Sequence, residues 1–126
     1  MTNEPKVVII DDDIFLSGIY GVKLEESGFD ARHAMTGTEA VELVKRLKPE
    51  VIISEVTLSG LDGFSLIELL KEKGELDMER SKFIFLTREN LNEVLDQAKD
   101  SGVSLCLSKN EHTFAEVVDM VKNLLD

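Results

Sequence analysis

A chain of 126 residues is long enough to bury one hydrophobic core and too short for a regulatory domain joined to an output domain, so we expect one domain, 1–126. Its 25 acidic and 14 basic residues give a formal charge of -11, which would repel nucleic-acid phosphates and argues against direct DNA or RNA binding. One cysteine excludes an intramolecular disulfide, the polar opening at 1–6 lacks a secretion signal, and no apolar run approaches the roughly 20 residues of a membrane span, so we expect a soluble, cytoplasmic protein.

Short apolar runs alternate along the chain with longer stretches of helical periodicity, which predicts repeated strand and helix units around a parallel sheet. Runs that are apolar throughout are typical of strands covered on both faces, whereas runs with polar residues are typical of sheet edges. Central strands are expected at 7–10, 51–53 and 83–86, and edge strands at 29–35 and 103–107.

Apolar residues recur at helical spacing between these runs and predict five helices. Gly37 or Thr38 is expected to begin the second helix, and residues 73–81 are expected to form a solvated loop. The helical sets are Phe15, Ile19 and Val22; Ala40, Leu43, Val44 and Leu47; Phe64, Ile67 and Leu70; Leu91, Val94, Leu95 and Ala98; and Phe114, Val117, Val118, Val121 and Leu125.

Five strands alternating with five helices predict a doubly wound α/β fold of the flavodoxin-like (βα)5 type, with a parallel sheet in the order 2-1-3-4-5. Ligands of such folds bind at the carboxyl ends of the strands, beside the point where the strand order reverses. We expect one pocket to hold the polar residues that follow or end the first, third, fourth and fifth strands, which are Asp11, Asp12, Glu55, Thr87 and Lys109.

Each of these residues has a functional and a structural interpretation. Adjacent carboxylates after a strand can hold a hard cation such as Mg2+, and they can also cap a helix. We favour the pocket for Asp11 and Asp12, and helix capping for Asp13. We expect Lys109 to face the pocket rather than solvent, and Thr87 to offer its hydroxyl to a phosphoryl or carboxylate oxygen.

The segment 49–64, PEVIISEVTLSGLDGF, together with these residues resembles the receiver domain of two-component response regulators. In that family the phosphoacceptor aspartate ends the third strand, where this chain has Glu55, and an aspartate-glycine pair follows at the place of Asp62 and Gly63. The likeness runs from residue 6 to residue 125 and implies a Mg2+ site and a switch that senses the phosphoryl group. The implied metal residues are Asp11, Asp12, Glu55 and Thr57, and the implied switch residues are Thr87, Lys109 and Cys106.

Five positions depart from the family pattern. Glu55 is one methylene longer than aspartate, and displacing a reacting carboxylate by about an ångström costs on the order of a hundredfold in rate, so phosphoryl acceptance and Mg2+ binding are both in doubt. Cys106 replaces an aromatic residue, Asn110 and Ser59 replace prolines, and Arg88 replaces a small residue.

We therefore expect no catalytic residue and hypothesise a receiver that works without phosphorylation, in which Glu55 gives Lys109 and Thr87 a permanent partner. Glutamate has one charge and two oxygens where a phosphoryl group has nearly two charges and three oxygens, so the mimicry would be incomplete. The alternatives are a folded remnant with an inert pocket and a conventional phosphoacceptor that uses another carboxylate.

Such a receiver would act in a phosphorelay by contact with a histidine kinase, a phosphotransfer protein or a downstream target. The resemblance implies a target or homodimer surface on the fourth helix, fifth strand and fifth helix, about 90–125, with Met120 and Cys106 as candidates for contact or core. Ile14 is the candidate for kinase docking, and we expect Phe15 in the core.

The alternative from another class is a phosphatase of the haloacid-dehalogenase type, with Asp11 as nucleophile in an Asp-x-Asp motif. The short chain and the pattern around Glu55 and Asp62 argue against it. A flavin-binding module is a weaker alternative, because no glycine-rich phosphate loop follows the first strand.

Overall fold

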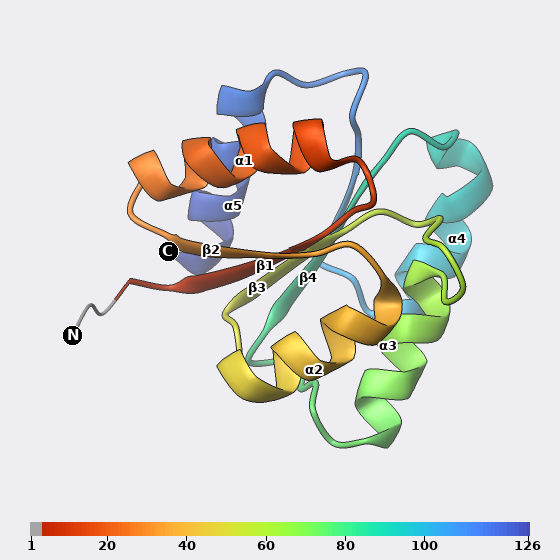
Figure 1. The fold of residues 1–126 in the computed structure, drawn as a ribbon. Coiled ribbons are helices and arrows are strands. Elements are labelled where there is room, and N and C mark those ends of the chain that lie inside the picture. Colours follow the sequence, from red (N-terminus) through yellow and green to blue (C-terminus); the bar gives the residue numbers. More distant parts are fainter. Residues whose placement is uncertain (1–3) are drawn as a thin grey trace.

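The computed structural model describes residues 4–126, so residues 1–3 of the polar opening lie outside it. Five parallel strands in the order β2-β1-β3-β4-β5 form one sheet with helices on both faces, which confirms the predicted fold (Figure 1). No helix of this described part is long and apolar enough to cross a membrane. The elements are β1 Lys6–Ile10, α1 Ile14–Glu26, β2 Asp30–Ala34, α2 Gly37–Leu47, β3 Val51–Ser54, α3 Gly63–Glu72, β4 Lys82–Thr87, α4 Leu91–Ser101, β5 Leu105–Ser108 and α5 Phe114–Leu125.

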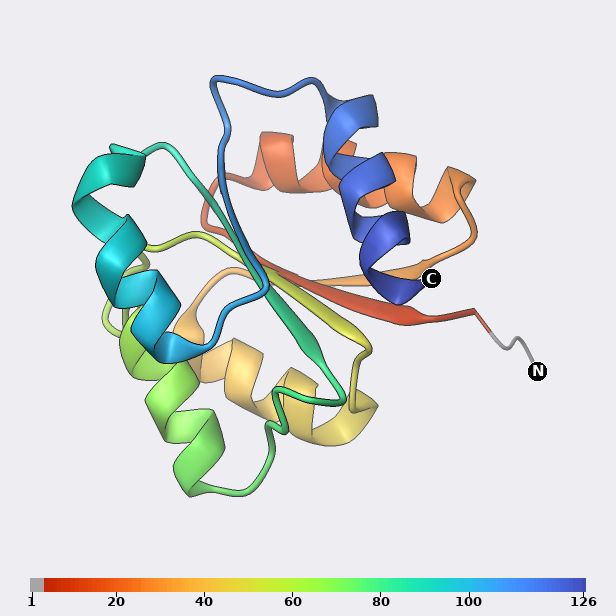
Figure 2. The same ribbon diagram turned by 180° about the vertical axis from the view of Figure 1, so that it is seen from behind.

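The sheet separates two hydrophobic clusters. Helices α1 and α5 cover one face and α2, α3 and α4 the other, as the opposite views in Figures 1 and 2 show. Successive side chains of a strand point to opposite faces, so β1 sends Val7 and Ile9 to the α1 and α5 side and Val8 and Ile10 to the other. All four are buried, because a central parallel strand is covered on both faces.

Helix α1 buries a different face from the one predicted. Phe15 is 85% exposed, and Ile19 and Val22 are also exposed, so the expectation that Phe15 lies in the core is wrong. The residues that α1 buries are Ser17, Tyr20, Gly21 and Leu24.

His33 on the edge strand β2 explains this orientation. A Cβ atom added to Gly21 would lie 2.6 Å from Nε2 of His33, so the ring can approach α1 only where the helix has no side chain. Ser17 Oγ and His33 Nδ1 are 2.7 Å apart and form a hydrogen bond. On the same face of α1, Tyr20 packs edge-on against Phe114 of α5, with ring centroids 4.7 Å apart.

Candidate functional site

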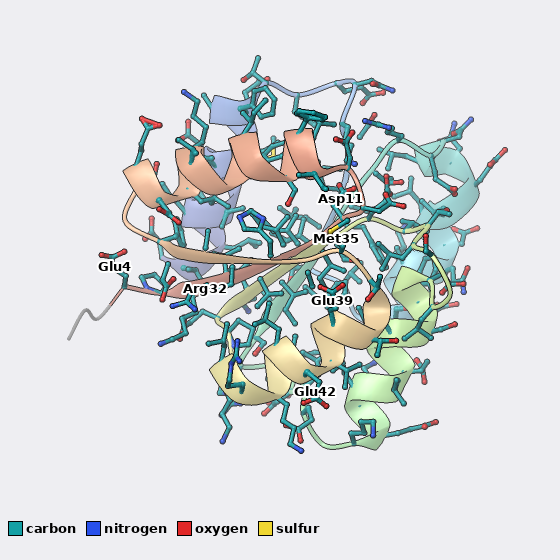
Figure 3. The ribbon with its side chains drawn as sticks, viewed as in Figure 1. Glu4, Asp11, Arg32, Met35, Glu39 and Glu42 are labelled. Atoms are coloured by element: carbon teal, nitrogen blue, oxygen red, sulfur yellow. The ribbon has the colours of Figure 1, made fainter. Side chains whose placement is uncertain are left out.

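The carboxyl ends of the strands form a cleft of about 500 Å³. Ile10 is paired with Ser54 across β1 and β3, so the next residues, Asp11 and Glu55, are neighbours at the point where the strand order reverses. Figure 3 shows Asp11 beside the first turn of α1 at this edge of the sheet. Among the residues that line the cleft are Asp11, Asp12, Glu55, Thr57 and Lys109.

Lys109 lies between two carboxylates at the base of the cleft. Its Nζ atom donates a hydrogen bond to Asp11 Oδ2 at 2.6 Å and lies 3.3 Å from Glu55 Oε1. The side chains of Lys109, Asp11 and Glu55 are 5%, 9% and 9% exposed. One cation therefore compensates two buried anions, in a setting where charges interact more strongly than in water.

Glu55 also accepts two hydrogen bonds from the backbone. The amide of Val56 donates to Oε2 at 2.7 Å, and the amide of Arg88 donates to Oε1 at 3.1 Å. Two amides and an ammonium group directed at one carboxylate form an oxyanion cradle, which we define as the Val56 and Arg88 amides together with the Lys109 Nζ atom. Hydrogen bonds to an ionised acceptor are about twice as strong as neutral ones, so the cradle stabilises a negative charge at this position.

Thr87 does not reach Glu55 in the way that the sequence suggested. Its side chain is buried at the end of β4, and its Oγ1 atom accepts a hydrogen bond from the amide of Glu89 at 2.9 Å. The amide of the next residue, Arg88, contacts the Glu55 carboxylate instead. Backbone amides carry no signature in a sequence, so this partner could not be predicted from residue types.

Two side-chain contacts cross the rim of the cleft. Arg88 Nη2 pairs with Asp13 Oδ2, and Thr57 Oγ1 donates to Glu89 Oε1. Asp13 also caps α1, since its Oδ1 atom accepts from the amide of Leu16 at 3.1 Å. This backbone hydrogen bond lowers the pKa of Asp13, and the positive charge of Arg88 lowers it further. Helix capping by Asp13 was predicted, whereas its ion pair with Arg88 was not.

The aspartate-glycine pair, Asp62 and Gly63, lies at the start of α3 beside Glu55. Asp62 caps α3 by accepting a hydrogen bond from the amide of Ser65 at 2.8 Å. A Cβ atom on Gly63 would lie 2.5 Å from a ring carbon of Phe85 and 2.9 Å from the carbonyl oxygen of Glu55, so only glycine fits. The pair therefore begins α3 directly against the loop that carries Glu55.

The remaining predicted residues lie away from the cradle. Cys106 is half-buried on the α2, α3 and α4 side of the sheet, and burial raises the pKa of its thiol, with a smaller contribution from the charge of Glu55. Met120 packs against the cluster on the α1 and α5 side. Ile14, by contrast, is 61% exposed at the start of α1.

Two carboxylates of the cleft, Asp11 and Glu55, already have partners at both of their oxygens, whereas Asp12 lines the cleft and is exposed. Asp11 uses one oxygen for Lys109 and the other for the amide of Asp13, and Glu55 uses both of its oxygens for amides. Within residues 4–126, no three His, Cys, Asp or Glu side chains are grouped so that they could hold a metal ion. A hard cation coordinated by Asp11 or Glu55 would share these oxygens with the ammonium of Lys109 and the backbone amides.

Comparison with known proteins identifies the family. The profile of the response regulator receiver domain matches residues 7–122. The chain belongs to this family. It is therefore a receiver domain of two-component signalling, and receivers typically bind Mg2+ at their phosphorylation site.

The curated relatives are longer than this chain. The DNA-binding dual master transcriptional regulator RpaA of Synechocystis is 30% identical over 107 residues, which cover 83% of this chain and 43% of RpaA. The probable transcriptional regulator ycf29 of Porphyra purpurea is 29% identical, over 94% of this chain and 56% of the relative. The chain thus spans about half the length of each relative, and the remaining half of each has no counterpart in the match.

Solved structures agree on the fold. The receiver domain of the Francisella response regulator 1452 has a TM-score of 0.83 and 28% identity, with 96% of each chain covered. The chemotaxis response regulator CheY4 of Vibrio cholerae has a TM-score of 0.85 over 97% of this chain and 99% of its own, and its 21% identity supports the fold alone.

Proposed function

We propose that this receiver domain signals by protein contact and without phosphorylation. In this proposal the carboxylate of Glu55 supplies, within the cleft, the negative charge that a phosphoryl group would otherwise bring. The observation that carries the proposal is the contact of both Glu55 oxygens with the oxyanion cradle. A residue held in this way is a poor nucleophile, since attack would require it to give up two hydrogen bonds and an ion pair.

The same arrangement favours a receiver over a phosphatase. Both oxygens of Asp11 are engaged, one by the buried ammonium of Lys109 and one by the amide of Asp13, so Asp11 is not placed as a free nucleophile. We further propose that Lys109 balances the charge of the cleft in place of Mg2+, and that Mg2+ binds the parent protein weakly.

The exposed surface of α1, together with Met35 after β2, is the proposed contact for a partner. We define the apolar face as Ile14, Phe15, Ile19, Val22 and Met35, which are the large hydrophobic residues recorded as exposed within residues 4–126. Such residues gathered on one surface mark an interaction site more often than scattered ones do. A helix of a histidine kinase or phosphotransfer protein is the proposed occupant. A homodimer through α4, β5 and α5 is less favoured, because Met120 and Cys106 are turned toward the core.

Acetyl phosphate with Mg2+, followed by mass spectrometry of the intact protein, tests the central proposal. We expect the parent to remain unlabelled and Glu55→Asp to gain one phosphoryl group, because the shorter side chain leaves the amides free to receive the phosphoryl oxygens. Glu55→Gln is the matched control and should remain unlabelled. Labelling of the parent at residue 55 would refute the proposal, and labelling at another carboxylate would favour the conventional alternative.

A further inference from the structure

Arg88 contacts two separate parts of the molecule. Its backbone amide donates to Glu55 Oε1 at 3.1 Å, and its guanidinium group pairs with Asp13 Oδ2 at the start of α1. The side chain therefore anchors the same residue whose amide completes the oxyanion cradle. This link joins positions 75 residues apart in the chain.

Glu89, the residue after Arg88, connects the β4–α4 loop to a second neighbouring loop. The amide of Glu89 donates to Thr87 Oγ1, and its carboxylate accepts from Thr57 Oγ1 in the β3–α3 loop. The loop after β4 is thus tied to the loop after β1 by Arg88 and to the loop after β3 by Glu89. Displacement of the Arg88 side chain would remove one of these two side-chain ties across the cleft.

We propose that the Arg88–Asp13 ion pair is a positioning pair that holds the β4–α4 loop where the amide of Arg88 reaches Glu55, and that it couples the oxyanion cradle to the start of α1. The inference rests on the proposed role of Glu55 and deepens it. Asp13 uses one oxygen to cap α1 and the other to bind Arg88, so a single carboxylate joins the cradle to the helix that carries the apolar face. The Arg88 and Asp13 side chains are 58% and 21% exposed, so the pair contributes little to global stability and its effect is local.

Hydrogen exchange and the proton chemical shift of the residue 88 amide measure this local effect directly. Arg88→Ala removes the guanidinium group and keeps the amide, whereas Asp13→Asn removes the charge and keeps an oxygen that can cap α1. We expect each variant to accelerate exchange of this amide by up to about fivefold, which corresponds to the loss of an exposed ion pair worth up to about 1 kcal/mol. The double variant should exchange no faster than either single one, and Arg88→Lys should restore part of the protection.

Arg32 and Asp30 provide a matched control pair on β2, with side chains 49% and 26% exposed. Arg32→Ala removes an ion pair of similar exposure from β2, which is separated from β4 by β1 and β3. The exchange rate of the residue 88 amide should therefore equal that of the parent. Additive effects of Arg88→Ala and Asp13→Asn, or normal exchange in both, would overturn the inference.

Glu55→Gln separates this inference from the proposed function. If that variant leaves the amide resonances of residues 56 and 88 in place, Glu55 does not occupy the cradle in solution and the proposed function fails. If it moves both resonances while Arg88→Ala and Asp13→Asn leave exchange unaltered, Glu55 keeps its role and the positioning pair alone is refuted.

Discussion

The ammonium of Lys109 lies 2.6 Å from Asp11 Oδ2, closer than the 3.3 Å that separates it from Glu55 Oε1. Lys109 is thus shared between two carboxylates that follow neighbouring strands, Asp11 after β1 and Glu55 after β3. Since the side chains of all three are less than a tenth exposed, their charges depend on one another for compensation.

Replacing Lys109 by methionine should destabilise the fold. The substitution keeps the apolar stem and leaves Asp11 and Glu55 buried as two like charges, so we expect the free energy of unfolding to fall by about 3 kcal/mol. Urea unfolding monitored by circular dichroism measures the change. Adding Asp11→Asn to Lys109→Met should recover part of the loss because it removes one charge. A Lys109→Met variant as stable as the parent would show that the cleft is solvated rather than dry.

Gly63 provides a test of close packing beneath Glu55. A methyl group at this position would meet Phe85 and the Glu55 carbonyl at distances that no relaxed structure tolerates, so we expect Gly63→Ala to cost about 1–3 kcal/mol of unfolding free energy. Gly18→Ala is the control, because it adds the same methyl group to the interior of α1 with nothing within 4 Å. That variant should be stabilised by about 0.5–1 kcal/mol through helix propensity. Equal effects at both positions would contradict the packing argument.

The order of the elements was predictable because the apolar runs of β1, β3 and β4 are too short and too continuous for anything but central strands. The orientation of α1 was not predictable, because this helix carries apolar residues on both of its faces. Its buried side combines Tyr20 and Leu24 with two small residues, Ser17 and Gly21, which lie against the ring of His33 on β2. A contact made through small residues leaves no hydrophobic periodicity in the sequence.

The exposure of Phe15 gives a direct test of that correction. We expect Phe15→Ser to leave the free energy of unfolding within about 0.5 kcal/mol of the parent, as for surface substitutions generally. Leu24→Ala, on the buried side of the same helix, should cost about 2–5 kcal/mol. Urea unfolding of both variants measures these losses and shows which face of α1 is packed in the core. A large loss in Phe15→Ser would restore the original assignment of Phe15 to the core.

The candidate site divides in the same way between predictable and unpredictable parts. Residues that follow parallel strands converge whatever their identity, so the meeting of Asp11, Glu55 and Lys109 follows from the strand order. The amide of Arg88 and its ion pair with Asp13 depend on the path of a loop, and loop paths are set by contacts between residues distant in sequence. The place of Glu55 at the end of the third apolar run could be read from the sequence, whereas the amides that donate to its carboxylate could be identified only in the structure.

His33 gives the stability of the fold a dependence on pH. His33 is exposed overall, but partial desolvation of its ring against α1 lowers its pKa below the usual 6.5, and the negative charge of Glu25 opposes this only in part. The unfolded chain therefore takes up the proton first as the pH falls. The contribution of His33 to stability is complete above pH 6.5 and is lost as the pH falls through the folded-state pKa. Urea midpoints measured from pH 8 to pH 5 should decline more steeply for the parent than for His33→Gln, which cannot be protonated in this range. Parallel profiles for the two proteins would show that the histidine ring is as well solvated in the fold as in the unfolded chain.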